Sequence, residues 1–281
     1  MNDQRLLSSY GLKWNPFSPE VPIEGLLVTP AIEQFQWRVG NLARSGGFAL
    51  ITADPGLGKS VALRLLTDRL DQERELVVGV LTRPQSNVAD FYRELGELFD
   101  VNLSPCNRWG GAKVLRQRWL AHINSVLLRP VLLIDEAQEM TPVAMNELRL
   151  LSAAELDSRS LLTVVFAGDA RLTNKLKTAE LLPLGTRIRV RLNLQPGTPK
   201  DLADCLVHAI TQAGNPNLMT EELIVTLTEH AVGNYRILMT MANELLDAAI
   251  QRKIKQLDEK LYLDCFALPA APKRTAKRGA A

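Results

Sequence analysis

Eight consecutive residues, Ala-Asp-Pro-Gly-Leu-Gly-Lys-Ser over positions 53–60, have the types and spacing that bind phosphate. They lie between an apolar run over residues 48–51 and a helix-like stretch over residues 61–70. A strand that enters a Gly-rich turn and then a helix directs successive backbone N–H groups, and the positive end of the helix, at one point. The consensus GxxxxGK[ST] has Gly where this chain has Ala53, and a negative φ there would tolerate the extra methyl group. The pattern predicts nucleotide binding by Asp54, Pro55, Gly56, Leu57, Gly58, Lys59, Ser60 and Val61.

Two neighbouring acids, Asp135 and Glu136, follow a short apolar run over residues 131–134. The length of this run and its branched side chains favour a parallel strand buried on both faces. Open α/β sheets bind their ligands at the carboxyl ends of such strands. In a P-loop ATPase, the Asp135 carboxylate and the Ser60 hydroxyl would bind Mg²⁺, and Glu136 would orient the attacking water. Alone, an acid pair is equally typical of a helix N-terminus, but together with the Lys59 loop it predicts ATP hydrolysis.

The composition indicates a protein that buries a large core and is not secreted. The chain has 281 residues, of which 46% are hydrophobic, which favours one main domain and a smaller one. Its three cysteines, Cys106, Cys205 and Cys265, lack the spacing of a disulfide framework or a zinc site. The sequence has neither a long apolar stretch nor a basic and then apolar leader. We therefore expect a cytoplasmic protein without a membrane partner.

Strand and helix patterns alternate between residues 30 and 192. Such alternation predicts an α/β fold in which a parallel sheet lies between two helical layers. A loop is expected over residues 101–111. Apolar spacing predicts helices over residues 30–43, 61–70, 88–99, 112–128, 143–154 and 170–178, strands over residues 48–51, 76–81, 131–134 and 162–167, and an extended segment over residues 186–192.

From residue 198 onward only helical patterns remain, over residues 198–214, 220–231, 235–253 and 258–266. They predict a small all-helical domain that acts as a lid over the nucleotide. The expected organisation is a lead-in segment over residues 1–29, an ATPase core over 30–196, a helical lid over 197–267 and a basic disordered tail over 268–281. The last ten residues hold four basic and no acidic side chains. Such tails contact nucleic acid or acidic partners, or are simply solvated.

Three arginines, Arg187, Arg189 and Arg191, alternate with Ile188 and Val190 in the extended segment, which places them on one face. Because adjacent like charges repel, their clustering favours a site that an anion approaches. One of the three, with Arg187 preferred, is a candidate arginine finger for the ATP of a neighbouring subunit. The alternative is an edge strand whose charges prevent aggregation.

Arg236 lies at the start of the predicted helix over residues 235–253. A basic residue at this position opposes the helix dipole. This favours a role in contacting phosphate, with a surface salt bridge as the alternative.

Taken in order, these motifs resemble the AAA+ ATPases of the ExeA group, which is similar to the transposition helper ATPases MuB, TnsC, TniB and IstB. The resemblance covers roughly residues 8–266. It implies a P-loop AAA+ core with a C-terminal helical lid, ATP and Mg²⁺ as ligands, and a hexameric ring or helical filament with ATP at subunit interfaces. It rests on the phosphate loop, the Ile-Asp-Glu-Ala-Gln segment, residues 146–152 (Asn-Glu-Leu-Arg-Leu-Leu-Ser), residues 166–169 (Phe-Ala-Gly-Asp), the arginine segment and residues 233–236 (Gly-Asn-Tyr-Arg).

The resemblance also implies a role for each motif residue. Lys59 and Ser60 would belong to Walker A, and the Asp135 and Glu136 pair to Walker B. Asp169 would occupy the sensor 1 position, where many relatives have Asn, Thr or Gln. Arg236 would be sensor 2 and would contact the γ-phosphate. Together with Ala53, the acidic sensor implies a slow ATPase that DNA or a partner stimulates.

The short chain and its basic tail resemble the transposition branch, because secretion-type ExeA proteins continue into a membrane span and a cell-wall-binding region. We therefore expect an ATPase that assembles on double-stranded DNA and recruits or activates a transposase, with other transposition proteins. Two alternatives stay open: a secretion or assembly ATPase that acts on protein partners, and a nucleotide switch with negligible turnover.

By analogy with loops of the helper ATPases, DNA phosphates would be contacted by Arg83, Gln85, Lys113, Arg116 and Arg118, with an ordinary polar surface as the alternative.

Overall fold

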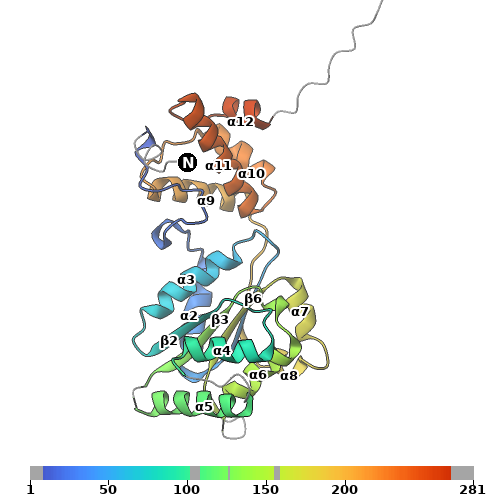
Figure 1. Cartoon of the computed structure of the whole chain (residues 1–281). Coiled ribbons are helices and arrows are strands. Elements are labelled where there is room, and N and C mark those ends of the chain that lie inside the picture. The colour runs from blue at the N-terminus through green and yellow to red at the C-terminus, as the bar shows by residue number, and fades with distance from the viewer. Residues whose placement is uncertain (1–8, 102–107, 126, 155–158, 267–281) are drawn as a thin grey trace, which may run out of the picture. The chain divides into compact units, whose positions relative to one another are not determined.

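The computed structural model describes residues 9–101, 108–125, 127–154 and 159–266 (Figure 1). The tail over residues 268–281, for which contact with nucleic acid was one expectation, lies outside the described residues. Within the described part, the chain divides into two compact units. One contains residues 9–21, 199–232 and 237–266, and the other contains residues 22–198 and 233–236.

The larger unit is built on a five-stranded parallel sheet with the order β2-β3-β6-β1-β7. In the register of this sheet, Ile51 pairs with Ala167 and Ile134 pairs with Phe166. The carboxyl ends of β1, β3 and β6 therefore lie at one edge, where the phosphate loop, the acid pair and Asp169 follow them. The strands are Gly47–Thr52 (β1), Leu76–Leu81 (β2), Arg129–Ile134 (β3), Thr163–Gly168 (β6) and Ile188–Asn193 (β7).

Helices cover both faces of the sheet (Figure 1). Along β1, Phe48 and Leu50 join the apolar cluster on one face, whereas Ala49 and Ile51 join the cluster on the other, as the two-residue repeat of a strand requires. This arrangement confirms the predicted α/β fold with three layers. One face packs against α2 (Pro30–Ser45) and α3 (Lys59–Asp71), and the other against α4 (Val88–Leu98), α5 (Arg108–Ser125), α6 (Pro142–Ser152) and α7 (Ala170–Leu176).

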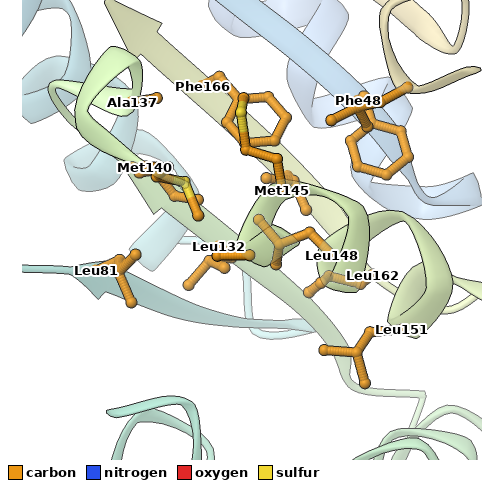
Figure 2. Packing of buried hydrophobic residues seen from close by; sticks show 14 of the residues in the cluster. Phe48, Leu81, Leu132, Ala137, Met140, Met145, Leu148, Leu151, Leu162 and Phe166 are labelled. Carbon is orange, nitrogen blue, oxygen red and sulfur yellow. The ribbon is translucent and has the colours of Figure 1, made fainter. Parts of the chain in front are cut away.

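The apolar cluster beneath α6 holds the central strands in place. Figure 2 shows Phe48, Leu132 and Phe166 from three strands beside Met145 and Leu148. The rings of Phe48 and Phe166 are stacked, with centroids 6.2 Å apart and planes 4° from parallel. Because the burial of apolar surface contributes about 25 cal/mol per Å², this cluster fixes the strands whose ends carry the polar residues.

Side-chain caps explain several of the helix starts. Thr29, Asn87 and Thr141 each accept a hydrogen bond from a backbone N–H three residues further on, at the starts of α2, α4 and α6. The helix predicted over residues 112–128 instead runs from Arg108 to Ser125, so the end of the predicted loop was wrong. Two consecutive glycines, Gly110 and Gly111, disfavour a helix locally, but packing of the rest of α5 outweighs that preference.

Three short elements were not anticipated. They are α8 (Leu182–Gly185) and an antiparallel pair of strands, β4 (Ala153–Ala154) and β5 (Arg159–Ser160). The described part also contains two single turns of 3₁₀ helix, η1 (Ile23–Gly25) and η2 (Ala137–Glu139). The second of these turns directly follows the acid pair.

The smaller unit is helical. Its described residues contain one isolated bridge, between Met219 and Leu257, but no strand. The N-terminal residues pack within this unit, since the Tyr10 hydroxyl donates to the Ile254 carbonyl and the Asn215 side chain donates to the Tyr10 carbonyl. Its helices are α9 (Pro199–Gln212), α10 (Glu221–His230), α11 (Tyr235–Arg252, whose first two residues belong to the larger unit) and α12 (Glu259–Phe266).

Candidate active site

The phosphate loop between β1 and α3 depends on two glycines. Gly56 and Gly58 have φ values of +86° and +95°, a region that other residues rarely adopt. The φ of Ala53 lies outside this region, so the methyl group at this departure from the consensus causes no backbone strain. The Ala53 N–H donates to the Gly168 carbonyl at 3.2 Å, which ties the loop to the end of β6.

Lys59 begins α3 and is almost completely buried, with 7% of its surface exposed. Its Nζ donates to the Ala53 carbonyl at 3.1 Å. The ammonium group, the loop N–H groups and the N-terminal end of α3 therefore lie around one small region. A buried positive charge at a helix N-terminus is a favourable environment for phosphate.

Ser60 and Asp135 are in direct contact at the edge of the sheet. The Ser60 hydroxyl donates to Asp135 Oδ2 at 2.8 Å, and Asp135 Oδ1 accepts from the Glu136 N–H at 2.8 Å. A hydroxyl and a carboxylate are oxygen ligands of the kind that Mg²⁺ prefers. Within the described residues, no group of three or more His, Cys, Asp or Glu could hold a metal alone.

Glu136 is exposed, and its backbone adopts the left-handed conformation, with φ 50° and ψ 38°. Its carboxylate accepts a hydrogen bond from Gln138 Nε2. Sequence reasoning did not single out Gln138, which lies only two residues beyond Glu136. The 3₁₀ turn η2 directs this side chain back toward the acid, and a single turn of this kind has no periodic pattern in the sequence.

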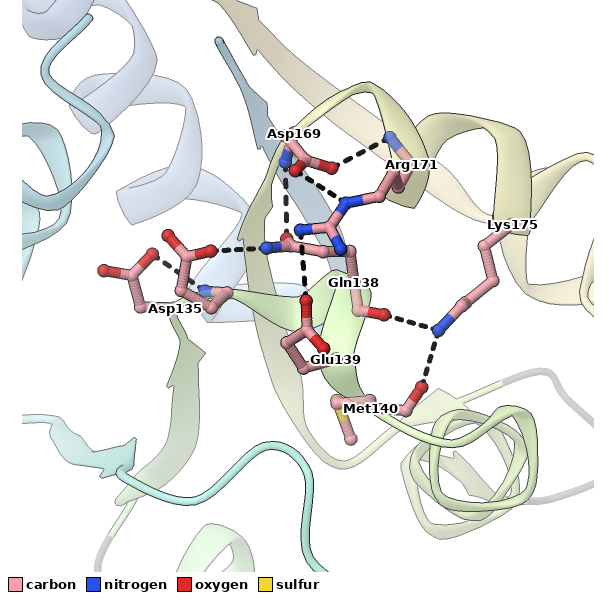
Figure 3. Close-up of polar contacts among 8 residues, drawn as sticks. Asp135, Gln138, Glu139, Met140, Asp169, Arg171 and Lys175 are labelled. Carbon is pink, nitrogen blue, oxygen red and sulfur yellow. Dashed lines mark hydrogen bonds and ion pairs between the residues drawn. The ribbon is translucent and has the colours of Figure 1, made fainter. Parts of the chain in front are cut away.

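Asp169 caps the start of α7, and its carboxylate is bound by Arg171. Asp169 Oδ1 accepts from the Arg171 N–H and Oδ2 from Arg171 Nε, both at 2.9 Å. Burial favours a higher pKa for Asp169, but the hydrogen bonds from Arg171 and the charges of Arg171 and Lys59 outweigh it, so the pKa is lowered. Arg171 also forms an ion pair with Glu139 at 3.1 Å. Figure 3 shows this cluster of polar contacts at the end of β6.

The segment Gly233–Arg236 belongs to the same compact unit as the phosphate loop and lies against it. The Arg236 N–H donates to the Gly56 carbonyl, and Asn234 Nδ2 donates to the Pro55 carbonyl, both at 3.1 Å. The main chain at Arg236 is thus placed at the loop, and its side chain is exposed. Asn234 is a second residue of this region that sequence reasoning did not identify.

The arginine segment lies at a different edge of the sheet. Arg189 and Arg191 are exposed on β7 while Ile188 and Val190 are buried, and Arg187 lies in the turn before the strand. Because Ile188 pairs with Phe48 at the beginning of β1, Arg187 lies at the edge opposite the phosphate loop. The structure therefore does not bring Arg187 to the phosphate loop of its own subunit.

The five candidate DNA contacts lie on two elements. Arg83 and Gln85 are exposed in the loop after β2. Lys113, Arg116 and Arg118 lie on α5, within the helix that the sequence predicted over residues 112–128. Arg118 forms a long ion pair with Asp100, at 3.9 Å, while α5 itself contains no acidic residue.

Comparison with known proteins places this arrangement in a known fold. Residues 43–176 match the family described as AAA domain. The chain is 29% identical over 216 residues to general secretion pathway protein A of Aeromonas hydrophila, a match that covers 75% of this chain and 39% of that protein. The chain thus spans about two fifths of that relative. No helix among the described residues is both long and apolar enough to span a bilayer.

Solved structures share the fold at low sequence identity. The Aeropyrum pernix ORC2 protein aligns with a TM-score of 0.70 at 12% identity, covering 88% of this chain and 69% of that chain. The Aeropyrum pernix ORC1 protein in complex with DNA aligns with a TM-score of 0.65 at 17% identity, covering 89% of this chain and 67% of that one. The chain therefore has the P-loop AAA+ fold, and its residues 43–176 are similar to the AAA domain family.

Proposed function

We propose that the chain binds ATP at the phosphate loop and hydrolyses it. The observation that carries this proposal is the 2.8 Å hydrogen bond between the Ser60 hydroxyl and the Asp135 carboxylate. It joins the helix start after the loop to the acid at the end of β3, and these two groups would hold Mg²⁺. When bound, the ion would neutralise negative charge on the β- and γ-phosphates.

The other residues supply binding and proton transfer. Lys59 and the loop N–H groups bind the phosphates, and Glu136 orients a water molecule toward the γ-phosphorus. The water oxygen bonds to that phosphorus, the bond to the β–γ bridging oxygen breaks, and a water proton passes to Glu136. ADP and phosphate are released, and Glu136 returns its proton to solvent.

Two arginines complete this proposal. Arg187 acts on the ATP of a neighbouring subunit in a ring or filament, a role that its position at the opposite sheet edge supports. Arg236 contacts the γ-phosphate of its own subunit, supported by the hydrogen bond between its N–H and the Gly56 carbonyl. Asp169 acts through its main chain, because Arg171 already binds its carboxylate.

We further propose that the assembled ATPase binds double-stranded DNA and recruits or activates a transposase. The exposed cations Arg83, Lys113 and Arg118, together with the absence of acids on α5, support binding to a phosphate backbone. A structural neighbour of the same fold, the ORC1 protein, is described in complex with DNA. ATP orders the oligomer on DNA, and hydrolysis releases it.

A second candidate function is an assembly or secretion ATPase that acts on protein partners. The 29% identity to general secretion pathway protein A favours it. The two candidates differ in a simple property, since only the first requires affinity for DNA.

The decisive experiment measures ATP binding, ATP turnover and oligomer formation with and without duplex DNA. Lys59→Ala should abolish ATP binding, whereas Glu136→Gln should bind ATP, lower turnover by about 10²- to 10⁴-fold and accumulate the ATP-bound assembly. The exposed residues Lys260 and Glu97 provide matched controls, as Lys260→Ala and Glu97→Gln, which should behave as wild type. Wild-type turnover in Glu136→Gln would contradict the site assignment. Turnover without any DNA affinity would favour the second candidate.

A further inference from the structure

Gln138 is a buried side chain, only 4% exposed, that uses both ends of its amide at the proposed site. Its Nε2 donates to Glu136 Oε2, and its Oε1 accepts from the Asp169 N–H at 3.3 Å. Figure 3 shows Gln138 between the residues that follow β3 and those that follow β6. A buried amide with both ends bonded has one favourable orientation, because turning it over would leave polar groups unpaired.

Residues of two other elements, α7 and β6, hold Gln138 in position. Lys175 of α7 donates from Nζ to the carbonyl of Gln138 and also to that of Met140, the latter at 2.8 Å. Gly168 at the end of β6 leaves space for the amide, since a Cβ at that position would lie 2.5 Å from Gln138 Oε1. Any side chain larger than that of glycine at residue 168 would therefore displace Gln138.

Glu136 depends on this support more than an ordinary surface acid would. It is exposed, and its left-handed backbone is a conformation that non-glycine residues hold only when the surrounding structure requires it. The Asp169 carboxylate does not reach across to it, because Arg171 binds that carboxylate. The connection from the end of β6 to Glu136 therefore runs from the Asp169 N–H through the Gln138 amide.

We propose that Gln138 is a positioning residue for ATP hydrolysis, which holds the Glu136 carboxylate and couples it to the main chain at Asp169. This inference rests on the proposed role of Glu136 in orienting the attacking water. One carboxylate oxygen is bound by Gln138, and the other orients the water. A shift of the Asp169 main chain, as when phosphate binds nearby, moves Glu136 through the amide and changes turnover without changing affinity for ATP.

The test compares two substitutions of Gln138 in the full chain. Gln138→Leu removes both hydrogen bonds at similar size and should lower kcat by about 10- to 100-fold, while the Kd for a fluorescent ATP analogue stays within about twofold of wild type. Gln138→Glu keeps an acceptor for the Asp169 N–H but places a second carboxyl group beside Glu136. Because the donor to Glu136 is lost and the two carboxyl groups repel each other, kcat should again fall while the Kd for the ATP analogue stays near the wild-type value. A purely structural role would lower ATP affinity and kcat together and would not separate them.

The matched control is Gln72→Leu, which changes an exposed glutamine bonded to Asp68 at the far end of α3 and should match wild type. The proposal is overturned if Gln138→Leu retains wild-type kcat, if its ATP affinity and kcat fall together, or if Gln138→Glu retains wild-type kcat. Parallel measurement of Glu136→Gln distinguishes failure of the proposed role of Gln138 from failure of the proposed function. Loss of turnover in Glu136→Gln but not in Gln138→Leu contradicts only the role of Gln138, and undiminished turnover in Glu136→Gln contradicts the proposed function as well. Adding Gln138→Leu to Glu136→Gln should cause no further loss, since both changes act on one carboxylate.

Discussion

Among single residues, Gly56 and Gly58 place different demands on the phosphate loop. Both have positive φ, but a Cβ on Gly56 would lie 2.3 Å from Asn234 Oδ1, whereas a Cβ on Gly58 would have no protein atom within 4 Å. Asn234 in turn donates to the Pro55 carbonyl. A side chain at residue 56 would therefore suffer both backbone strain and crowding, whereas a side chain at residue 58 would suffer backbone strain alone.

We expect Gly58→Ala to lower the free energy of unfolding by about 1–2 kcal/mol, the cost of a left-handed residue with a Cβ. Gly56→Ala should cost about 1 kcal/mol more, because the hydrogen bond of Asn234 is also lost. Urea unfolding of the nucleotide-free variants measures both values. Equal losses would show that the contact with Asn234 contributes nothing.

The pairing of Asp169 with Arg171 predicts a pH dependence of stability. The pKa of Asp169 in the folded protein lies below its ordinary value of 3.8, since the contacts with Arg171 and the charge of Lys59 outweigh burial. A lowered pKa means that ionised Asp169 stabilises the fold above pH 3.8, and that this contribution is lost as the pH falls through the folded pKa.

Asp169→Asn keeps a side chain that can cap α7 but removes the charge. We expect the variant to be less stable than wild type at neutral pH, with a difference that shrinks as the pH falls below about 4. Urea midpoints of both proteins between neutral pH and about pH 3 provide the measurement. A difference that stays constant over this range would rule out the charge as its cause.

At the scale of elements, α5 is anchored by Trp119. This side chain is completely buried, and its ring packs edge-on against Phe99, with centroids 5.3 Å apart. Trp37 on α2 is, in contrast, 61% exposed. The two tryptophans therefore provide a matched pair of sites for one substitution.

Trp119→Ala should destabilise the protein by about 3–5 kcal/mol, because it leaves a large cavity under α5. Trp37→Ala should change stability by no more than about 0.5 kcal/mol. Chemical unfolding followed by circular dichroism distinguishes the two. Similar effects at both sites would mean that α5 is not held by its packing.

Sequence patterns predicted most of these elements, and the strand over residues 76–81 was predicted at its observed bounds. The start of α5 was missed because the glycines at its beginning lower local helix preference, whereas Leu115 and Trp119 supply the packing that forms it. The turn η2 was missed because a single 3₁₀ turn has no period to detect. Because that turn determines the orientation of Gln138, the contact between Gln138 and Glu136 was not predicted either.

At the scale of the whole molecule, the position of Arg187 predicts catalysis between subunits. Arg191 donates to the Gly185 carbonyl at 3.1 Å, and Arg187 lies in the turn that leads into β7. Arg187→Ala should bind ATP normally and lose turnover by about 10³-fold, whereas Arg189→Ala should have a small effect. Mixing Arg187→Ala with Lys59→Ala subunits should restore part of the turnover, because each supplies what the other lacks. Absence of any recovery would contradict a role in trans.

The proposed DNA surface predicts a dependence of binding on salt. If Arg83 and Arg116 contact phosphates, each change to Ala should weaken binding to all duplex sequences and reduce the slope of log affinity against log salt by about 1. Arg252→Ala, which breaks an exposed ion pair with Asp264, should leave the slope unchanged. Fluorescence anisotropy at several salt concentrations measures this. No affinity for duplex DNA at low salt would instead support a protein partner.

The sequence by itself determined the features that depend on neighbours along the chain. The Gly-rich octet before Val61, the acid pair after residues 131–134, and the alternation of strands and helices are local patterns. They follow from backbone geometry and burial, which have fixed periods of two residues in a strand and 3.6 in a helix. These patterns were sufficient to predict the layered α/β fold and the phosphate loop.

Only the tertiary structure decided which side chains meet. The strand order brings Ser60 to Asp135, places Arg187 at the opposite edge, and sets Gln138 between Glu136 and Asp169. It also joins residues 9–21 to the helical unit and Asn234 to the phosphate loop. Periodicity indicates the face on which a residue lies, but not the element that packs against it. Hydrogen-bond partners distant in sequence compete for the same polar atoms, and that competition is resolved only when the strands and helices pack.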